Sequence, residues 1–152
     1  MDEIKTIIQG ILKRVPGIKG LILLDIDGIP VEIAGNFEMK PEDMGALLAA
    51  CYNSYAQVGV ELGQNLDMII IEYGDLKLCQ SGMPRGLLTI IASKESYLGL
   101  IRLEAKRAME MLGRLMQDTQ DLRKTMMERH KFRMPGDQDI EMILAKLRKG
   151  LT

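Results

Sequence analysis

The links between the apolar runs are very short, and they limit the possible fold more than any other feature. The runs lie at residues 21–26, 29–33, 68–73, 76–80 and 87–92. Asp27-Gly28 joins the first two, Gly74-Asp75 joins the third and fourth, and the segment 83–86 leads to the last. Parallel neighbours need a crossover of about a dozen residues or more, whereas a two-residue link containing glycine is typical of a hairpin. The spacing therefore predicts five strands in a mainly antiparallel sheet.

Helical periodicity surrounds these strands. Apolar residues recur every three or four positions over 2–15, and Pro16-Gly17 ends that pattern. Pro41, followed by two acidic residues, is typical of a helix start and predicts a second helix over 41–62. A third helix is predicted from about Tyr97. The order of helix, two strands, helix, three strands and helix indicates an α+β domain over 1–117.

The composition changes after residue 117. Five basic residues and one acidic residue occupy 123–133, which predicts a helix extension and basic linker over 118–136. Pro135-Gly136 then breaks the chain, and Asp137 is a suitable cap for a final amphipathic helix over 137–152. The apolar residues of this helix include Ile140, Ile143, Leu144 and Leu147.

Several kinds of function are excluded by composition. The chain has 20 basic and 21 acidic residues and no Trp, so neither a general excess of positive charge nor stacking platforms favour nucleic acid. Cys51, Cys79 and the single His130 have no metal-ligand or disulfide spacing, and we expect both thiols to be reduced and buried. No apolar run reaches the roughly 18 residues of a membrane span. We therefore expect a cytoplasmic protein that does not insert into membranes and has no metal or cofactor.

Asp25 and Asp27 form the most enzyme-like pattern. They end an apolar run and resemble the opening motif of haloacid dehalogenase-type phosphohydrolases, in which one carboxylate attacks phosphorus and the other handles a proton. The rest of the chain is short and antiparallel for such an enzyme. We favour the alternative, an Asp-Gly hairpin turn, and keep a small phosphohydrolase as a remote alternative.

The predicted helix at 41–62 has no charged residue over the seventeen positions 44–60. One stripe can face the sheet, and it contains Leu47, Leu48, Cys51, Tyr55, Val58 and Leu62. The second stripe is small or weakly polar, and it contains Ala46, Ala49, Ala50, Asn53, Gln57 and Val60. A solvated outer stripe normally carries Lys or Glu. We interpret the second stripe as a protein interface rather than as an alanine-rich solvated face.

The apolar run at 68–71 has no polar position, so both faces of this strand are apolar. Such a strand suits a sheet that helices cover on two sides. At an open edge it would also pair readily with a copy of itself.

These motifs resemble those of the roadblock family, also called the dynein light-chain roadblock family. Residues 18–34, with Gly20 and the Asp27-Gly28 turn, resemble its first hairpin. Leu98-Gly99-Leu100-Ile101-Arg102, followed by Ala105, Lys106 and Arg107, resembles the start of its last long helix. The resemblance covers about residues 3–117 and is closest to MglB-like prokaryotic regulators of small GTPases.

The resemblance implies a five-stranded sheet with the middle helix on one face and the first and last helices on the other. It also implies a homodimer in which the third strands join and the middle helices lie side by side. The expected interface residues are Val60, Asp67, Met68, Ile69, Ile70, Ile71, Glu72 and Tyr73.

The resemblance further implies a non-catalytic regulator that binds a Ras-like, MglA-like small GTPase and stimulates its GTP hydrolysis. The expected GTPase-binding residues are Ala46, Ala49, Ala50, Asn53 and Gln57, with Ile140, Ile143, Leu144 and Leu147 from the final helix. The alternative is a roadblock scaffold or motor-associated adaptor that has no activating role.

Overall fold

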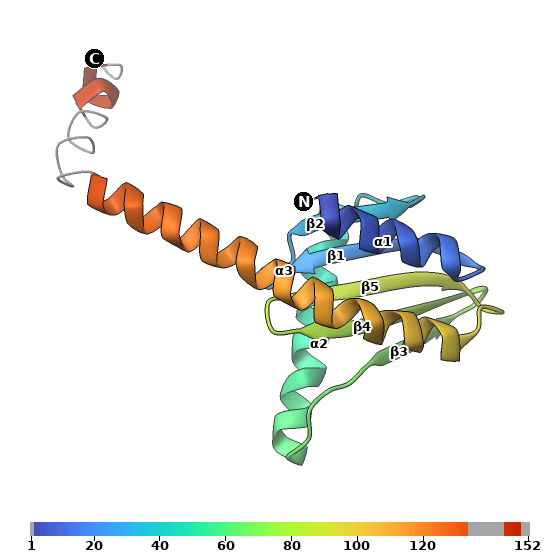
Figure 1. Ribbon diagram of the computed structural model, residues 1–152. Coiled ribbons are helices and arrows are strands. Elements are labelled where there is room, and N and C mark those ends of the chain that lie inside the picture. The colour runs from blue at the N-terminus through green and yellow to red at the C-terminus, as the bar shows by residue number, and fades with distance from the viewer. Residues whose placement is uncertain (1, 134–144, 150–152) are drawn as a thin grey trace. The chain divides into compact units, whose positions relative to one another are not determined.

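The computed structural model describes residues 2–133 and 145–149 (Figure 1). Its helices and strands follow the predicted order: α1 (Asp2–Arg14), β1 (Ile18–Asp25), β2 (Pro30–Gly35), α2 (Pro41–Leu62), β3 (Ile69–Tyr73), β4 (Leu76–Met83), β5 (Gly86–Ser93) and α3 (Leu98–Arg133). Strand β1 begins three residues earlier than predicted, because Ile18 pairs with Ala92 of β5. Strand β4 continues to Met83 because its last residues also pair with β5.

The sheet has the strand order β2-β1-β5-β4-β3, and every neighbouring pair is antiparallel. This arrangement confirms the prediction from the short links. The long connection through α2 separates β2 from β3, which become the two edge strands. Among the described residues, the apolar strand β3 therefore has β4 on one side and no strand on the other.

The two faces of the sheet carry separate cores. Leu21 and Leu23 of β1 pack with α1 and α3, whereas Ile22 and Leu24 pack with Leu48 of α2. Side chains of a strand alternate between faces, so one strand contributes to both cores. Figure 1 shows α1 and α3 on one side of the sheet and α2 on the other. The predicted α+β fold class is confirmed.

Helices α1 and α3 are also joined by an ion pair. Two nitrogen atoms of Arg14, Nε and an Nη, donate to Oε2 of Glu104 at 3.0 and 2.9 Å. The Glu104 side chain is only 4% exposed, whereas that of Arg14 is 57% exposed. Arg107 lies farther away, with 3.8 Å between its Nη1 and Oε1 of Glu104. Arg14 is therefore the main partner of this buried carboxylate.

We expect Arg14→Ala to lower the free energy of unfolding by about 2 kcal/mol, because the buried carboxylate loses its close charged donor. Arg107→Ala is the matched control and should cost less than about 0.5 kcal/mol, since its contact is long and exposed. Urea denaturation of both variants measures the difference. Equal effects of the two substitutions would contradict the assignment of Arg14 as the main partner.

The chain divides into two compact units, Met1–Gln117 and Asp118–Thr152. Helix α3 continues through most of the predicted linker at 118–136 and ends at Arg133. Residues 145–149 are helical, but the rest of the predicted final helix, including Ile140, Ile143 and Leu144, lies outside the described residues. Within the part that the structure describes, no helix is long and apolar enough to cross a membrane.

Candidate protein-interaction site

The close approach of two glycines positions α2 against the first hairpin. Gly28 occupies the β1–β2 turn with φ +82°, a backbone conformation that residues other than glycine rarely adopt. Its carbonyl oxygen lies so close to Gly45 that a Cβ atom on Gly45 would overlap it. Both residues therefore have to be small for the N-terminal part of α2 to reach the turn.

Hydrogen bonds of two polar side chains connect α2 to the sheet. Nε2 of Gln80, which is 1% exposed, donates to the carbonyl oxygen of Leu48 at 3.3 Å. The Tyr52 hydroxyl lies at the backbone of Gly82, where an added Cβ would overlap it. Burial raises the pKa of the Tyr52 phenol above its usual 10.0, although the backbone hydrogen bond with Gly82 partly offsets that effect. The phenol therefore stays neutral at physiological pH, as a group in this half-buried position should.

The far half of α2 continues past the edge strand β3 (Figure 1). Several large apolar side chains of α2 are exposed, including some that face β3 across an open hollow. They form a stripe with helical spacing, which we call the lateral stripe: Leu47 (60% exposed), Cys51, Tyr55 (59%), Val58 (52%) and Leu62 (71%). Of the residues predicted to face the sheet, only Leu48 is buried. Tyr55, Val58 and Leu62 face β3 across an open hollow and stay largely exposed.

The cysteines also differ from expectation. Cys79 is 1% exposed, and burial raises its pKa, so its thiol stays protonated. Cys51 is exposed on the lateral stripe, so the prediction that it is buried is wrong.

The residues predicted to bind a partner lie mainly on the surface of α2. Ala46, Ala50, Asn53 and Gln57 are exposed, and we call this set the outer stripe. Ala49 is only 7% exposed, so it lies beneath this surface and not on it. Val60 is 66% exposed on the same helix. Glu42 and Asp43 lie in the first turn of α2 and Glu61 in the last, and the helix has no basic residue.

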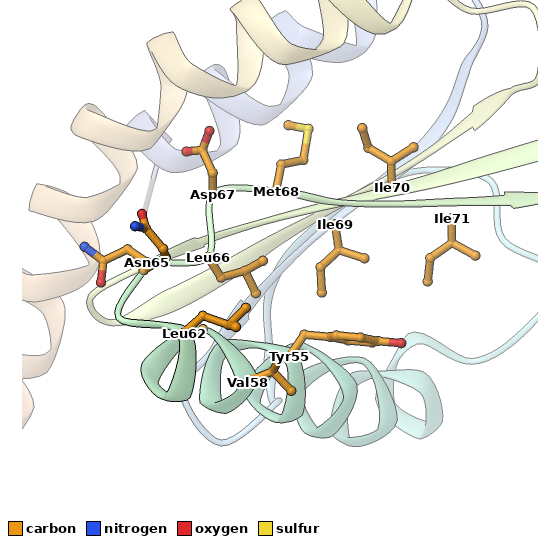
Figure 2. Close-up of a pocket in the computed structure, with 12 residues that line it drawn as sticks. Tyr55, Val58, Leu62, Asn65, Leu66, Asp67, Met68, Ile69, Ile70 and Ile71 are labelled. Carbon is orange, nitrogen blue, oxygen red and sulfur yellow. The ribbon is translucent and has the colours of Figure 1, made fainter.

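The edge strand β3 presents apolar side chains in both directions. Ile69 and Ile71 point toward α2, whereas Met68 and Ile70 point to the opposite face (Figure 2). Two large side chains of β3 are exposed, Ile70 at 37% and Tyr73 at 56%. Within the described residues the outer edge of β3 is therefore unpaired and largely apolar. An edge of this kind tends to pair with a strand of another chain.

A hollow of about 530 Å³ lies between β3 and the far half of α2. Tyr55, Val58 and Leu62 line it from the helix, and Ile69 and Ile71 line it from the strand (Figure 2). The polar residues of its lining lie mainly in the loop between α2 and β3, and they are Gln64, Asn65 and Asp67. Because the lining is apolar and lacks a cluster of titratable groups, the hollow suits protein contact better than chemistry.

The Asp25 carboxylate accepts hydrogen bonds from the backbone of its own turn. Its Oδ1 accepts hydrogen bonds from the backbone N–H groups of Asp27 and Ile29, at 2.9 and 3.0 Å. These bonds close the β1–β2 turn, as an aspartate side chain commonly does. The favoured interpretation, a hairpin turn, thus accounts for the geometry around Asp25. Among the described residues, no group of three His, Cys, Asp or Glu side chains could hold a metal ion.

Residues 2–119 match the family described as "Mitogen-activated protein kinase kinase 1 interacting". The chain belongs to this family. Similar sequences include the proteins named "Uncharacterized protein MJ1340" and "Uncharacterized protein MJ0714" from Methanocaldococcus jannaschii. Each is 28% identical over 104 residues, which cover 66% of this chain and 90% or 86% of the relative.

Several solved structures have a similar fold. Myxococcus xanthus MglB is 21% identical with a TM-score of 0.71, and the match covers 76% of this chain and 96% of that one. The mglB gliding protein of Thermus thermophilus is 16% identical with a TM-score of 0.68, over 77% and 90% of the two chains. A roadblock/LC7 domain from Streptomyces avermitilis is 21% identical with a TM-score of 0.64, over 76% and 95%. The predicted resemblance to roadblock domains, close to MglB, is confirmed in the fold.

Sequence patterns alone did not single out Gly45 or the lateral stripe as functional. A glycine inside a predicted helix is a detectable signal, because it costs stability unless packing requires it. The exposure of the lateral stripe has no comparable signal, since it depends on where the sheet ends.

Proposed function

We propose that this protein is a non-catalytic homodimeric regulator that binds a Ras-like, MglA-like small GTPase and stimulates its GTP hydrolysis. The observation that carries the proposal is the charge-free outer stripe on a helix that projects past an unpaired apolar strand, in a fold similar to that of MglB. It acts in the cytoplasm, without a cofactor, a metal or nucleic acid.

Dimerisation is the first part of the proposal. The unpaired edge of β3 would join the same edge of a second copy, which adds backbone hydrogen bonds and buries Ile70 and Tyr73. The lateral stripes would lie at the same interface, where exposed apolar area is removed from water. Light scattering should give twice the chain mass at micromolar concentration, and a monomer mass throughout that range would reject the dimer.

The GTPase contact is the second part. Small side chains on the outer stripe allow a partner backbone to approach closely, and no lysine or glutamate has to be desolvated there. The acidic ends of α2 favour a partner with basic residues around its contact surface, which makes association faster at low salt. Co-purification from the native organism, followed by a GTP-turnover assay with the recovered GTPase, tests binding and activation separately. A GTPase that binds with unchanged turnover would favour the scaffold alternative.

Ala50→Arg is expected to weaken GTPase binding at least tenfold, because it adds bulk and charge in the middle of the outer stripe. Leu103→Arg is the matched control, since Leu103 is 47% exposed on α3 at the opposite face of the sheet. Calorimetry with the recovered GTPase gives the affinity, and thermal denaturation with light scattering checks folding and dimer mass.

An Ala50→Arg variant that is folded, dimeric and fully able to bind would mean that the outer stripe is not the docking surface. The final amphipathic segment would then be the better candidate, through Ile140, Ile143, Leu144 and Leu147. Leu147 is 57% exposed.

A further inference from the structure

The turn between β1 and β2 exposes two large apolar side chains. Ile26 is 50% exposed and Ile29 is 60% exposed, and Asp27 and Gly28 lie between them in the chain. We call residues 26–29 the hairpin tip. Exposed turn positions are usually occupied by Gly, Pro, Asn, Asp or Ser. The packing of the described chain therefore does not account for two exposed isoleucines within four residues.

Hydrogen bonds hold the hairpin tip in one conformation. The Asp25 carboxylate, on a residue that is only 8% exposed, accepts from the backbone N–H groups of Asp27 and Ile29. The N–H of Gly28 donates to the carbonyl oxygen of Asp25 at 3.1 Å, and the N–H of Asp25 donates to that of Ile29 at 2.9 Å. A partner that binds the hairpin tip thus has little backbone entropy to remove, which favours affinity.

The hairpin tip adjoins the outer stripe of α2. A Cβ atom on Gly28 would lie 2.9 Å from the Cα atom of Ala46, which is the first residue of that stripe. Because consecutive Cα atoms are about 3.8 Å apart, the Cα atoms of Asp27 and Ile29 lie within about 8 Å of the Cα atom of Ala46. The hairpin tip and the outer stripe are therefore adjacent parts of one surface.

The hairpin tip belongs to the edge of the sheet that is farther from β3. In the strand order β2-β1-β5-β4-β3, strands β5 and β4 separate β1 from β3. Pairing of β3 with a second copy would therefore leave Ile26 and Ile29 exposed. The proposed dimer does not supply their cover, so a different partner has to contact them.

The charges around the hairpin tip are mainly acidic. Asp27 is exposed within it, and the exposed Glu42 and Asp43 occupy the first turn of α2, shortly before the glycine that contacts the tip. Lys40 is the basic residue that precedes this helix. Carboxylates beside two exposed isoleucines are complementary to an apolar depression that has arginine or lysine side chains next to it.

We propose that the hairpin tip is a specificity-determining anchor for the GTPase, in which Ile26 and Ile29 enter an apolar depression on the GTPase and Asp27 faces a basic side chain beside it. This inference rests on the proposed function and extends the docking surface from α2 to a second element of the chain. The small residues of the outer stripe allow close approach of many partner surfaces. The two isoleucines and the carboxylate require a matching depression and a cation, so they select among partners.

The combined substitution Ile26→Ser with Ile29→Ser tests the apolar part of the anchor. It is expected to weaken binding of the recovered GTPase roughly 30-fold or more, because a few buried apolar anchors carry much of the affinity of an interface. Leu103→Ser is the matched control at an exposed leucine of α3, on the opposite face of the sheet from α2, and should leave the affinity unchanged. Calorimetry gives the affinity, and thermal denaturation with light scattering checks folding and dimer mass.

Asp27→Asn tests the charge separately. Stopped-flow mixing with the recovered GTPase should show slower association than for the unmodified protein, and a smaller effect of added salt. Asp75→Asn is the matched control, because it removes the same charge from the β3–β4 turn. The two turns lie at opposite ends of the strands, since Asp25 and Leu76 pair with opposite ends of β5. The control should therefore associate at the unmodified rate.

The outcomes distinguish the anchor from the proposed function. Full binding by the double isoleucine variant, with binding lost in Ala50→Arg, would overturn the anchor and leave the proposed function standing. Equal association rates of Asp27→Asn and Asp75→Asn would overturn the charge contact. Failure of the unmodified protein to retain any GTPase would overturn both proposals. Weaker binding by the folded, dimeric double variant, with slower association of Asp27→Asn alone, supports the anchor.

Discussion

Gly45→Ala is expected to destabilise the protein by about 1 to 3 kcal/mol, because the added Cβ overlaps a backbone atom that cannot rotate away. That atom is the Gly28 carbonyl oxygen, and the side chain of Leu24 lies 3.0 Å from the same Cβ position. Either α2 or the β1–β2 turn has to move. Because α2 carries the outer stripe, we also expect weaker partner binding, measured by calorimetry on protein that remains folded.

Gly113→Ala is the matched control on another helix. Nothing lies within 4 Å of a Cβ placed on Gly113, so the substitution only improves helix propensity and should stabilise by about 0.5 to 1 kcal/mol. Chemical denaturation of the two variants should therefore give changes of opposite sign. If Gly45→Ala were also stabilising, the glycine contact would not hold α2 in position.

Leu62→Glu is expected to dissociate the proposed dimer while leaving the fold of each chain intact. Leu62 is 71% exposed, so a carboxylate there stays hydrated in the monomer. In the proposed dimer the same carboxylate would lie at an apolar interface between the two copies, where an unpaired charge is costly. We expect the dissociation constant to rise roughly 100-fold or more, which corresponds to about 2.7 kcal/mol.

Leu103→Glu provides the comparison for this substitution. It makes the same chemical change at another exposed leucine, on α3 at the opposite face of the sheet from α2. Sedimentation across a concentration series should give a dimer for Leu103→Glu and mainly monomer for Leu62→Glu, with similar thermal stability of the monomeric chains. Dimers of equal strength would mean that the end of α2 lies outside the interface.

These two experiments concern different contacts of one helix. Gly45 holds the first part of α2 against its own hairpin, whereas Leu62 lies on the part that projects past β3. The first contact positions the outer stripe within a chain, and the second would join it to another chain in the proposed dimer. A partner that binds the outer stripe should therefore be sensitive to both substitutions.

Local sequence determined the strands and their antiparallel pairing, for a simple reason. The Asp27-Gly28 and Gly74-Asp75 links are too short for any other connection, and alternating side chains assign each strand residue to one of two faces. The start of α2 was equally readable from Pro41 and the two acids that follow it. The hydrogen bonds of Asp25 agree with the turn that the Asp-Gly pair predicted.

The exposure of the α2 residues depended on tertiary structure. The sequence marks Leu47, Tyr55, Val58 and Leu62 as an apolar stripe, but the stripe faces a sheet only where a sheet is present. The strand order β2-β1-β5-β4-β3 ends the sheet at β3, and α2 continues beyond that edge. Sequence periodicity determined which residues share a side of the helix. The finite width of the sheet decided that those beyond β3 have no cover within their own chain, because burial depends on what lies opposite a side chain as well as on its polarity.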